Sequence, residues 1–355
     1  YQQNIVDDKF ESFSAELRSE LKQTSADTVI LSDEGLISLS EGSVQKFKEF
    51  LECEFSGFEI NIVIIAREPV SFFTSRCQQF ISNRYFDMDA VKDFLDGRNI
   101  VNGDSRADNL AMNPTSFYSK PVGIYDKVFN NVHILQFEEA IKDQVGMTHF
   151  FLKSFGLDVE CSDIRKNESR SWRAIELIAY INSKFVFSWD HEKNNLRYWN
   201  DLKDFFSISG GKYSLPKATQ ELIRGKTRGQ AEWLQKRCGV DYTDQFTDAN
   251  DEPNIWDDTF SKEIVSFYPK QSVFVKVLIA SFVDEKCASV EDAVSKDSLA
   301  KLRTWIGQED PYSALLSKLN FSLVVKLILF KRWSVSKMNV ARQCLARSKR
   351  SINIA

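Results

Sequence analysis

The sequence predicts an α/β fold with a parallel sheet, followed by a helical C-terminal part. Over residues 1–156, short runs of branched apolar residues alternate with longer segments of helical periodicity, which is the pattern of a parallel sheet. After Glu168 the strand-like runs stop and only helical spacing remains. With 355 residues, the chain is long enough for one large domain or for two domains.

The first part of the chain contains three predicted strands. Of these, Ile62 to Ala66 reads as a buried strand, and Pro69 then opens a helix, because a proline at the first helical position loses no hydrogen bond. In chain order we expect a helix at Phe10–Leu21, a strand at Thr28–Leu31, a helix at Ser43–Phe55, the strand Ile62–Ala66, a helix from Pro69 to about Asn83, a short helix at Met88–Leu95, a loop at 99–116, a strand at Asn131–Phe137 and a helix at Phe150–Phe155 that stops at Gly156.

The second part of the chain is predicted to be helical. The pattern is strongest from Trp172 to Val186, and an acidic, irregular stretch from Asp241 to Asp258 indicates a boundary. We therefore expect an α/β domain at residues 1–245, an acidic linker at 246–258 and a helical, basic region at 259–355. Between these landmarks we expect a loop at Ser207–Ser214 and helices at Pro216–Arg224 and Gln230–Cys238.

Cysteine and histidine usage narrows the class of protein. The six cysteines form no CxxC pair and the three histidines lie far apart, which argues against a structural zinc site and a disulfide framework. We expect reduced cysteines in a cytoplasmic protein. The longest apolar run near the end, Ser322–Phe330, contains Lys326 and is shorter than the roughly 20 residues of a spanning helix. Because the chain starts at Tyr1, we expect the natural sequence to continue upstream.

Arg67 follows the apolar run Ile62–Ala66, where a charge is costly unless it has a partner. The carboxyl ends of such strands are where open α/β sheets bind ligands. Ser75 follows eight positions later on the helix opened by Pro69, so a guanidinium and a hydroxyl could face one anion, with the helix N-terminus adding backbone N–H groups. The alternative is an ordinary ion pair between Arg67 and a carboxylate such as Glu68, with Ser75 incidental.

The stretch IVIIAREPVSFFTSRCQQF, residues 62–80, resembles the 3′-phosphate-binding segment of sulfotransferases that use 3′-phosphoadenylyl sulfate (PAPS). In that family a hydrophobic strand precedes Arg-x-Pro, and a serine follows eight residues after the arginine. Arg67, Pro69 and Ser75 match this pattern, while Cys77 stands where the family often has an aromatic residue. The resemblance implies that Arg67 and Ser75 contact the 3′-phosphate of the donor.

Four further segments resemble bacterial sulfotransferase-like proteins in the same order, so the resemblance covers roughly residues 8–245. It implies a P-loop-NTPase-like parallel sheet flanked by helices, with a helical C-terminal extension. TVILSDEGL (28–36) resembles the family's preceding strand and its acidic Ser-x-Glu turn, and VHILQFEEA (132–140) resembles the later strand that ends in an aromatic residue and a Glu. KNESRSW (166–172) resembles the Asn-Glu-Ser turn of bacterial sulfotransferase-like proteins. AEWLQKRCGVDYTD (231–244) resembles their Asn-x-Trp-Leu…Gly segment, with Ala231 where Asn is usual.

One departure from the family concerns the donor's 5′-phosphosulfate. The family holds this group in an N-terminal strand–loop–helix that carries Lys and Gly-Thr residues, whose backbone N–H groups cradle the phosphate. No such stretch precedes Thr28, and neither GGK (210–212) nor GKTRG (225–229) follows a predicted strand. We expect either that the natural chain carries the loop upstream or that the protein is a relative that has lost catalysis.

The resemblance implies transfer of a sulfuryl group from PAPS to an acceptor hydroxyl. Glu34 follows the strand run Thr28–Leu31, where family members place a catalytic His or Glu, so we expect it to be the general base. Asp33 is the nearby competitor, Ser32 could orient the base or touch the donor, and a solvated turn residue is the alternative for Glu34. No metal is expected, because Arg67, the loop amides and the Lys of the missing N-terminal loop would supply the positive field.

Several other polar residues have expected roles. Lys212, Lys226 and Arg228 are expected to lie in loops that fold over the nucleotide, although exposed basic loop residues are commonly just solvated. Structural roles are expected for Glu138, which would close a strand end against a neighbouring helix, for Asn167 and Ser169 as helix caps, and for His133 as a core residue.

The C-terminal stretch Pro311 to Ala355 carries nine basic and no acidic residues, although the whole chain has a net charge of −4. Apolar residues between Leu316 and Phe330 lie beside Lys318 and Lys326 in helical spacing. Such a helix could make peripheral contact with an anionic membrane, or it could dock on the α/β domain with its basic side toward an anionic glycan. Packing in a core is the commonest use of an apolar helix face.

The resemblance thus predicts a PAPS-dependent sulfotransferase that acts on a carbohydrate or other hydroxyl acceptor and has no nucleic-acid partner. A non-catalytic sulfotransferase-like binding or scaffold protein is the first alternative, and a P-loop kinase relative is the second.

Overall fold

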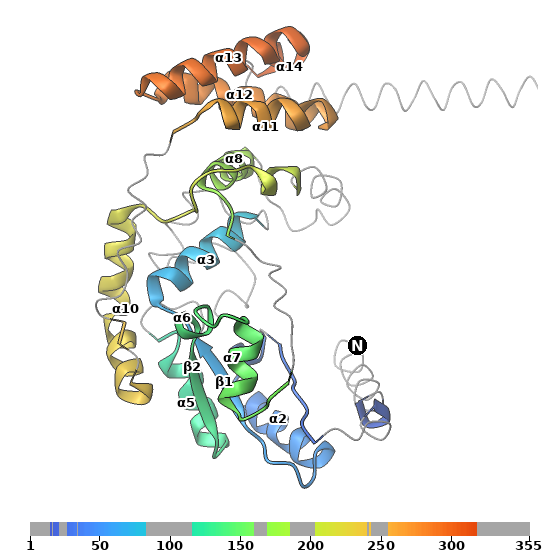
Figure 1. The fold of residues 1–355 in the computed structure, drawn as a ribbon, viewed down its shortest axis with the longest axis vertical. Coiled ribbons are helices and arrows are strands. Elements are labelled where there is room, and N and C mark those ends of the chain that lie inside the picture. Colours follow the sequence, from blue (N-terminus) through green and yellow to red (C-terminus); the bar gives the residue numbers. More distant parts are fainter. Residues whose placement is uncertain are drawn as a thin grey trace, which may run out of the picture. The chain divides into compact units, whose positions relative to one another are not determined.

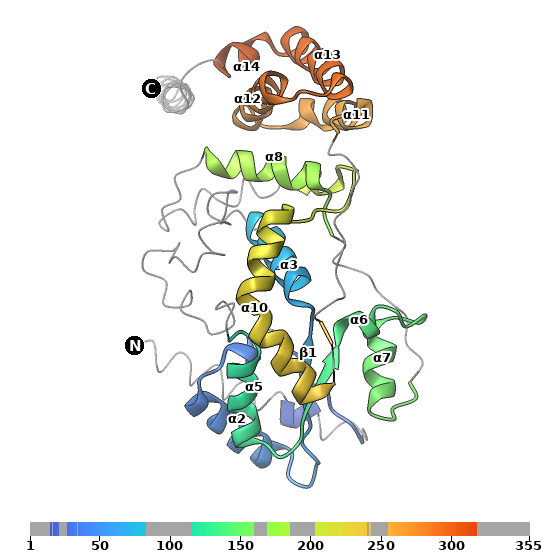
Figure 2. The ribbon, with the colours of Figure 1, turned by 90° about the vertical axis from the view of Figure 1, so that its left-hand side faces the viewer.

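The computed structural model describes residues 15, 17–20, 27–33, 35–82, 116–159, 169–184, 203–239, 241–242 and 255–317 (Figures 1 and 2). The chain divides into two compact units, each assembled from stretches that are separated in the sequence. Unit 1 comprises residues 1–73, 94–166 and 217–247, and unit 2 comprises residues 74–93, 167–216 and 248–355. The division at residues 245 and 259 expected from the sequence stays a prediction, and most of the acidic linker lies outside the described residues.

Unit 1 is an α/β unit whose described part holds a sheet of two parallel strands. Ile62 pairs with Val132 and Ala66 pairs with Gln136, so the two strands run in register over their full length. The elements of unit 1 are η1 (Leu36–Ser38), α2 (Glu41–Glu54), β1 (Ile62–Ala66), the start of α3 (Pro69–Ser82), α5 (Ser119–Val128), β2 (Val132–Gln136), α6 (Phe137–Ala140), α7 (Met147–Ser154) and α10 (Lys217–Cys238).

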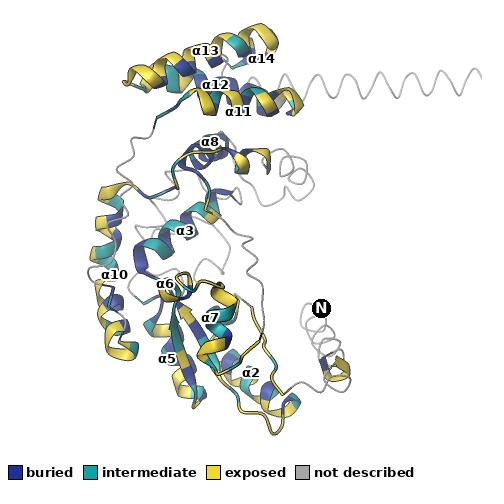
Figure 3. Ribbon diagram, viewed as in Figure 1, coloured by how far each residue is buried: buried dark blue, intermediate teal, exposed yellow. Residues whose placement is uncertain are grey.

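The core of unit 1 lies between one face of the sheet and helices α2 and α5. Ile64 and Val132 point into it from the strands, because alternate residues of a strand face the same side. Val44 of α2 and Val122 of α5 are fully buried against them. Figure 3 colours each residue of the ribbon by its burial. This packing fixes the two strands side by side and therefore fixes where their carboxyl ends lie.

Unit 2 is helical in its described part. Its core is aromatic: the rings of Trp172 and Trp256 meet edge to face at 4.6 Å, and Trp256 meets Phe260 in the same way at 4.6 Å. Such pairs add stabilisation beyond the area that they bury. The elements of unit 2 are the rest of α3, α8 (Trp172–Ser183), η4 (Lys203–Ser207), α11 (Asp258–Phe267), η5 (Tyr268–Lys270), α12 (Val273–Ser289), α13 (Ala293–Glu309) and α14 (Pro311–Leu316).

Side-chain caps explain where six of the described helices begin. A Ser or Asp side chain at the N-cap accepts a hydrogen bond from a backbone N–H of the first turn, which would otherwise lack a partner. Each such cap stabilises its helix by about 1 kcal/mol. The capping residues are Ser40 for α2, Ser171 for α8, Asp257 for α11, Ser272 for α12, Asp292 for α13 and Asp310 for α14.

The structure confirms the coarse α/β class and several elements predicted from the sequence. The strand Ile62–Ala66, the helix that begins at Pro69 and the later strand are all present, and the two strands are parallel. The predicted strand at Thr28–Leu31 is wrong, since this segment has no strand among the described residues, although Val29 packs on the core of unit 1. A tetrapeptide run with Ile30 and Leu31 exposed leaves too little buried surface to select a strand.

Helix α10 joins two segments that the sequence analysis kept apart. Buried Ile223, Thr227 and Leu234 recur at helical spacing on one side of it, whereas Gly225 and Gly229 are exposed. The Thr227 hydroxyl also donates to the Ile223 carbonyl oxygen at 2.7 Å. Burial of that face therefore outweighs the poor helix propensity of the two glycines, and GKTRG is helix interior, not a loop.

Some expectations fall on residues that the structure does not describe. The predicted short helix at Met88–Leu95, most of the predicted helix at Phe10–Leu21 and the basic C-terminal segment after Ser317 are among them. Along the described segments, no helix combines the length and the apolar character needed to cross a membrane.

Candidate functional site

The carboxyl ends of β1 and β2 place four residues together. Because Ala66 pairs with Gln136 in a parallel register, the next residues along each strand also meet, Arg67 with Phe137 and Glu68 with Glu138. The Arg67 Cζ atom lies 4.5 Å from the centre of the Phe137 ring, and the Glu68 backbone N–H donates to Glu138 Oε1 at 2.9 Å. The register of the sheet thus brings these four residues together.

Arg67 is held in place by its backbone and by its Nε atom. Its backbone N–H donates to the Tyr118 hydroxyl at 2.7 Å, and that hydroxyl donates back to the Arg67 carbonyl oxygen at 3.1 Å. The Nε–H donates to Ser71 Oγ at 2.8 Å. Within the described residues, no carboxylate lies within ion-pair distance of Arg67, and its Nη1 and Nη2 atoms have no protein partner.

Glu68 does not pair with Arg67 but caps helix α3. Its Oε1 atom accepts from the Val70 N–H at 2.9 Å and its Oε2 atom accepts from the Ser71 N–H at 2.6 Å. The ion pair that the sequence left open is therefore absent from the described contacts. The expectation that α3 offers these backbone N–H groups to an anion is wrong, because the Glu68 carboxylate already occupies them.

Glu138 closes the end of β2, as the sequence analysis expected. Its side chain is buried, and its Oε2 atom lies 3.0 Å from the Tyr242 hydroxyl. The same hydroxyl lies 3.2 Å from the Ala66 carbonyl oxygen, so Tyr242 bridges the ends of the two strands. Burial of a carboxylate is tolerated when both oxygens accept hydrogen bonds, which is the case here.

Burial sets the proton affinities of the site. It lowers the pKa of Arg67, an effect opposed by the nearby Glu138, Tyr118 and Glu68, yet an arginine stays charged at neutral pH. Burial raises the pKa of Glu68, against the two backbone N–H bonds that its carboxylate accepts. It also raises the pKa of Tyr118 and Tyr242, so both phenols remain neutral and keep their hydroxyl protons.

The other basic residues proposed from the sequence are not in a common loop. Lys226 and Arg228 lie inside α10, so the prediction that they belong to a loop is wrong. Lys226 is half-buried there, and Arg228 is exposed and pairs with Glu232 one turn on. Lys212 lies in unit 2, in an antiparallel bridge with Ser171.

Ser75 lies half-buried on α3, and the boundary between the two units falls ahead of it, after Phe73. Glu34 lies outside the described residues, whereas its competitor Asp33 is exposed and accepts from the Gly35 N–H at 2.6 Å. Arg67 therefore lies among contacts with Tyr118, Ser71 and Phe137, while the binding roles of Arg67 and Ser75 and the catalytic role of Glu34 stay predictions.

Two structural expectations are also corrected. His133 is exposed, not a core residue; it bonds to Asn61 at 3.0 Å, because its position in β2 points away from the core that Val132 faces. Helix α8 is capped by Ser171, whose Oγ accepts from the Ala174 N–H, not by Ser169. Asn167 lies outside the described residues.

Sequence reasoning missed Phe137, Ser71 and the two tyrosines of the site. A signal existed for Phe137, because QFEE follows one predicted strand as AREP follows the other, and aligning the two strand ends puts Phe137 beside Arg67. No local pattern marks Tyr118 or Tyr242, which reach the site from segments 51 and 176 residues away from their strand partners.

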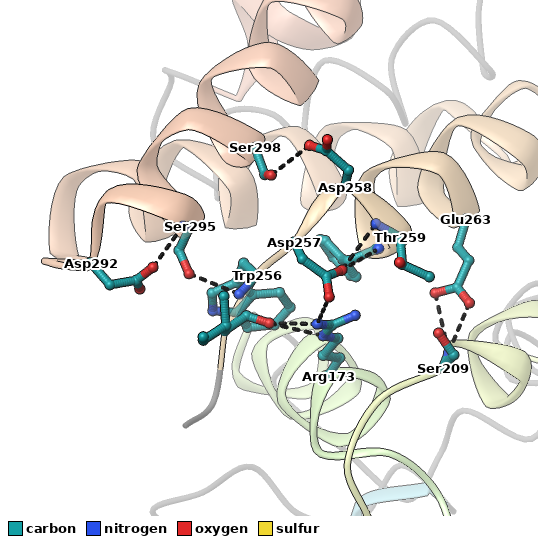
Figure 4. Close-up of polar contacts among 12 residues, drawn as sticks. Arg173, Ser209, Trp256, Asp257, Asp258, Thr259, Glu263, Asp292, Ser295 and Ser298 are labelled. Carbon is teal, nitrogen blue, oxygen red and sulfur yellow. Dashed lines mark hydrogen bonds and ion pairs between the residues drawn. The ribbon is translucent and has the colours of Figure 1, made fainter. Parts of the chain in front are cut away.

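A second buried arginine, Arg173 at the start of α8, lies in unit 2 (Figure 4). Its Nε and Nη2 atoms donate to the Ile255 carbonyl oxygen at 3.1 and 2.6 Å, and Nη2 also lies 2.7 Å from Asp257 Oδ2. Asp257 in turn caps α11 through Thr259 and Phe260. Every one of these contacts joins protein to protein, so Arg173 ties α8 to the segment that leads into α11.

Comparison with known proteins gives no relative: no family model, no curated protein and no solved structure matches this chain. No group of three or more His, Cys, Asp or Glu side chains that could hold a metal ion occurs in the described part of the chain. The case for a function therefore rests on the sequence motifs and on the geometry around Arg67.

Proposed function

We propose that the protein is a PAPS-dependent sulfotransferase, which transfers a sulfuryl group from PAPS to a hydroxyl acceptor such as a carbohydrate, on a P-loop-NTPase-like fold. In this proposal Arg67 binds the 3′-phosphate of the donor. The observation that carries it is the state of Arg67: a charged side chain at the carboxyl end of a parallel strand, stacked on Phe137, with Nη atoms that lack a protein partner among the described residues.

The geometry around Arg67 suits an oxyanion. The guanidinium is a planar fork whose hydrogen bonds to phosphate are charge-assisted and often bidentate. The cation–π contact with Phe137 and the Nε bond to Ser71 hold the guanidinium in position before a ligand arrives, so little side-chain entropy is lost on binding. Partial burial strengthens the attraction, since the local dielectric is lower than that of water.

The remaining roles follow the family resemblance. Ser75 would add a hydroxyl to the 3′-phosphate, Glu34 would take the acceptor's proton, and Lys212, Lys226 and Arg228 would add positive charge near the nucleotide. Since Lys226 and Arg228 project from a helix, they would act from a fixed position and not by closure of a loop.

A second candidate is a non-catalytic sulfotransferase-like protein that binds the nucleotide without transferring the sulfuryl group. One observation favours it: GKTRG lies inside α10, so this glycine-rich stretch does not form a phosphate loop between a strand and a helix. Both candidates use the same Arg67 contact, and they differ in whether the sulfuryl group is transferred to an acceptor hydroxyl, with adenosine 3′,5′-bisphosphate as the leaving group.

The test is a calorimetric titration of adenosine 3′,5′-bisphosphate, with 5′-AMP as the comparison, into the full-length protein and into Arg67→Ala. A charge-assisted contact to phosphate implies a loss of roughly 10- to 100-fold in bisphosphate affinity in Arg67→Ala, with 5′-AMP little changed. Arg303→Ala is the matched control, because Arg303 is exposed and paired with Asp284. Equal binding of both nucleotides by the wild type, or binding of neither, would reject the proposal.

A further inference from the structure

Ser71, on the first turn of α3, is the residue that touches the Arg67 side chain through a hydrogen bond. Its Oγ atom accepts from Arg67 Nε at 2.8 Å, and its side chain is half-buried. The Arg67 Nη atoms are bonded to the same carbon as Nε, so the Ser71 hydroxyl lies beside the fork that would hold an anion. The motif comparison assigned no role to Ser71, because it pointed to Ser75 one turn further along α3.

The hydroxyl group of Ser71 has one proton to donate as well as lone pairs to accept. The Arg67 contact uses a lone pair, and among the described residues no acceptor takes the Ser71 hydroxyl proton. An oxyanion held by Arg67 would give this proton a charged acceptor, and hydrogen bonds to charged acceptors are roughly twice as strong as those between neutral groups.

Backbone donors do not compete for this role. The N–H groups of Val70 and Ser71 already donate to the Glu68 carboxylate. An anion that approaches Arg67 from the side of α3 therefore meets the Ser71 hydroxyl before it meets an unused amide of the first turn.

We infer that Ser71 and Arg67 bind the same tetrahedral oxyanion, a phosphate or sulfate monoester group. The Arg67 Nη atoms would donate to two of its oxygens while the Ser71 hydroxyl donates to one of them. The inference rests on the proposed function for the identity of the anion, the 3′-phosphate of the donor. It adds a specificity-determining residue to that site and makes Ser71, close to the guanidinium, a direct contact.

The test uses the same titration with Ser71→Ala and Ser71→Thr. Ser71→Ala should weaken binding of adenosine 3′,5′-bisphosphate by about 10-fold and leave 5′-AMP unchanged, because one hydrogen bond to a charged group is lost. Ser71→Thr keeps the hydroxyl and should restore most of the affinity. Ser154→Ala is the matched control, since that helical hydroxyl already donates to the Phe150 carbonyl oxygen at 2.7 Å.

Measuring Ser71→Ala in the Arg67→Lys variant separates a direct contact between Ser71 and the anion from an effect of Ser71 through Arg67. Lysine has no Nε–H donor in the position of the arginine fork, so in Arg67→Lys the Ser71 hydroxyl can no longer orient residue 67 in the same way. A direct contact predicts that Ser71→Ala still weakens bisphosphate binding several-fold in this background. Loss of the effect would overturn the inference and leave Ser71 as a support for Arg67.

The outcomes for the inference and for the proposed function are distinct. Wild-type affinity in Ser71→Ala, together with a large loss in Arg67→Ala, would overturn the inference and retain the proposed function. If the wild type does not prefer the bisphosphate, the proposed function fails. Inorganic phosphate then serves as the probe, and the inference requires that phosphate raise the thermal midpoint of the wild type more than that of Ser71→Ala. An equal rise in both would reject it.

Discussion

Two arginines at the ends of secondary-structure elements, Arg67 in unit 1 and Arg173 in unit 2, meet opposite surroundings. Arg173 is 6% exposed, and its Nε and Nη2 atoms donate to the Ile255 carbonyl oxygen and, for Nη2, to the Asp257 carboxylate. Arg67 is less deeply buried. Among the described residues, its side chain donates one hydrogen bond, from Nε to Ser71 Oγ, and its guanidinium lies over the Phe137 ring. Arg173 therefore links two parts of unit 2, whereas Arg67 is held in position by unit 1 and, within the described part of the chain, keeps its Nη atoms available for a ligand.

The difference shows that burial of an arginine is not by itself a sign of function. What separates the two is where their hydrogen bonds go. Removing an arginine whose Nε and Nη2 atoms donate to a protein carbonyl oxygen and a carboxylate takes a donor from each of these acceptors, which costs stability. Removing one whose outer donors face no protein group costs little stability and exposes its role in binding.

The largest effect is expected from Arg173→Ala. This change removes the donor of the Ile255 carbonyl oxygen and the cation beside Asp257 Oδ2, while Asp257 Oδ1 keeps its two backbone donors. We expect it to lower the free energy of unfolding of unit 2 by about 3 kcal/mol, the low end for a buried pair because Asp257 is partly exposed. Arg67→Ala should cost unit 1 about 1 kcal/mol, since it removes one hydrogen bond and one cation–π contact. Denaturant titration followed by tryptophan fluorescence measures the first loss, because Trp172 and Trp256 lie beside Arg173 in the core.

Arg303→Ala serves as the surface control and should change stability by less than about 1 kcal/mol. If Arg173→Ala unfolds at the same midpoint denaturant concentration as the wild type, the contrast between the two arginines is contradicted.

A smaller effect is expected from Tyr242→Phe. The variant keeps the ring but removes the hydroxyl that lies 3.0 Å from Glu138 Oε2, so a buried carboxylate oxygen loses its donor. We expect unfolding to become easier by about 2 kcal/mol, because hydrogen bonds to charged groups contribute about 1.5–3 kcal/mol. Tyr125→Phe is the comparison: its hydroxyl donates to the neutral Leu36 carbonyl oxygen, and its loss should cost about 1 kcal/mol. Thermal melts of both variants check the ranking, and equal losses in the two variants would contradict it.

The smallest effect concerns pH and sharpens the comparison of the two units. Burial raises the pKa of Glu68, so the folded state holds this proton more tightly than the unfolded state does. The contribution of Glu68 is therefore most favourable below the ordinary carboxyl pKa, and it declines as pH rises through the raised value. Glu68→Gln does not titrate, so its melting temperature should gain on that of the wild type between about pH 4 and about pH 7.

Asp257 in unit 2 should show the opposite slope. Desolvation raises its pKa, but hydrogen bonds from Arg173 and from the backbone of α11 outweigh this and lower it overall. Its contribution is thus present above the ordinary aspartate pKa and lost as the solution is acidified. Asp257→Asn should therefore fall further behind the wild type as pH rises from about 2 to about 5. Parallel pH curves for the two variants would count against both assignments.

The strands and α3 could be predicted from the sequence because their signals are local. Ile62–Ala66 is a run of branched apolar residues, and Pro69 marks a helix start on its own. Helix α5 was not predicted, since Pro121 and Gly123 break its pattern; it forms because Val122 and Tyr125 are buried against α2 and the sheet, and because Gln230 accepts from the backbone N–H groups of Tyr118 and Ser119 at its start. That support comes from more than 100 residues away.

The candidate site likewise has features that local sequence predicts and features that depend on tertiary contacts. The position of Arg67 at a strand end follows from local sequence, whereas its freedom from a carboxylate among the described residues depends on Glu68 turning to cap α3. The sequence shows that Glu68 is adjacent to Arg67, but it does not show whether the Glu68 carboxylate accepts from Arg67 or from the backbone of α3. The contacts of Tyr118 and Tyr242 depend on tertiary packing alone.

The two glycines inside α10 have a consequence for the order of folding. Each lowers helix propensity by about 1 kcal/mol relative to alanine, so the 22-residue segment Lys217–Cys238 would not hold a continuous helix in isolation. Its middle can become helical only once Ile223, Thr227 and Gln230 have found their partners, among them the start of α5. We therefore expect α10 to form late, closing over a sheet and an α5 that are already assembled, and to be absent from the folding nucleus of unit 1.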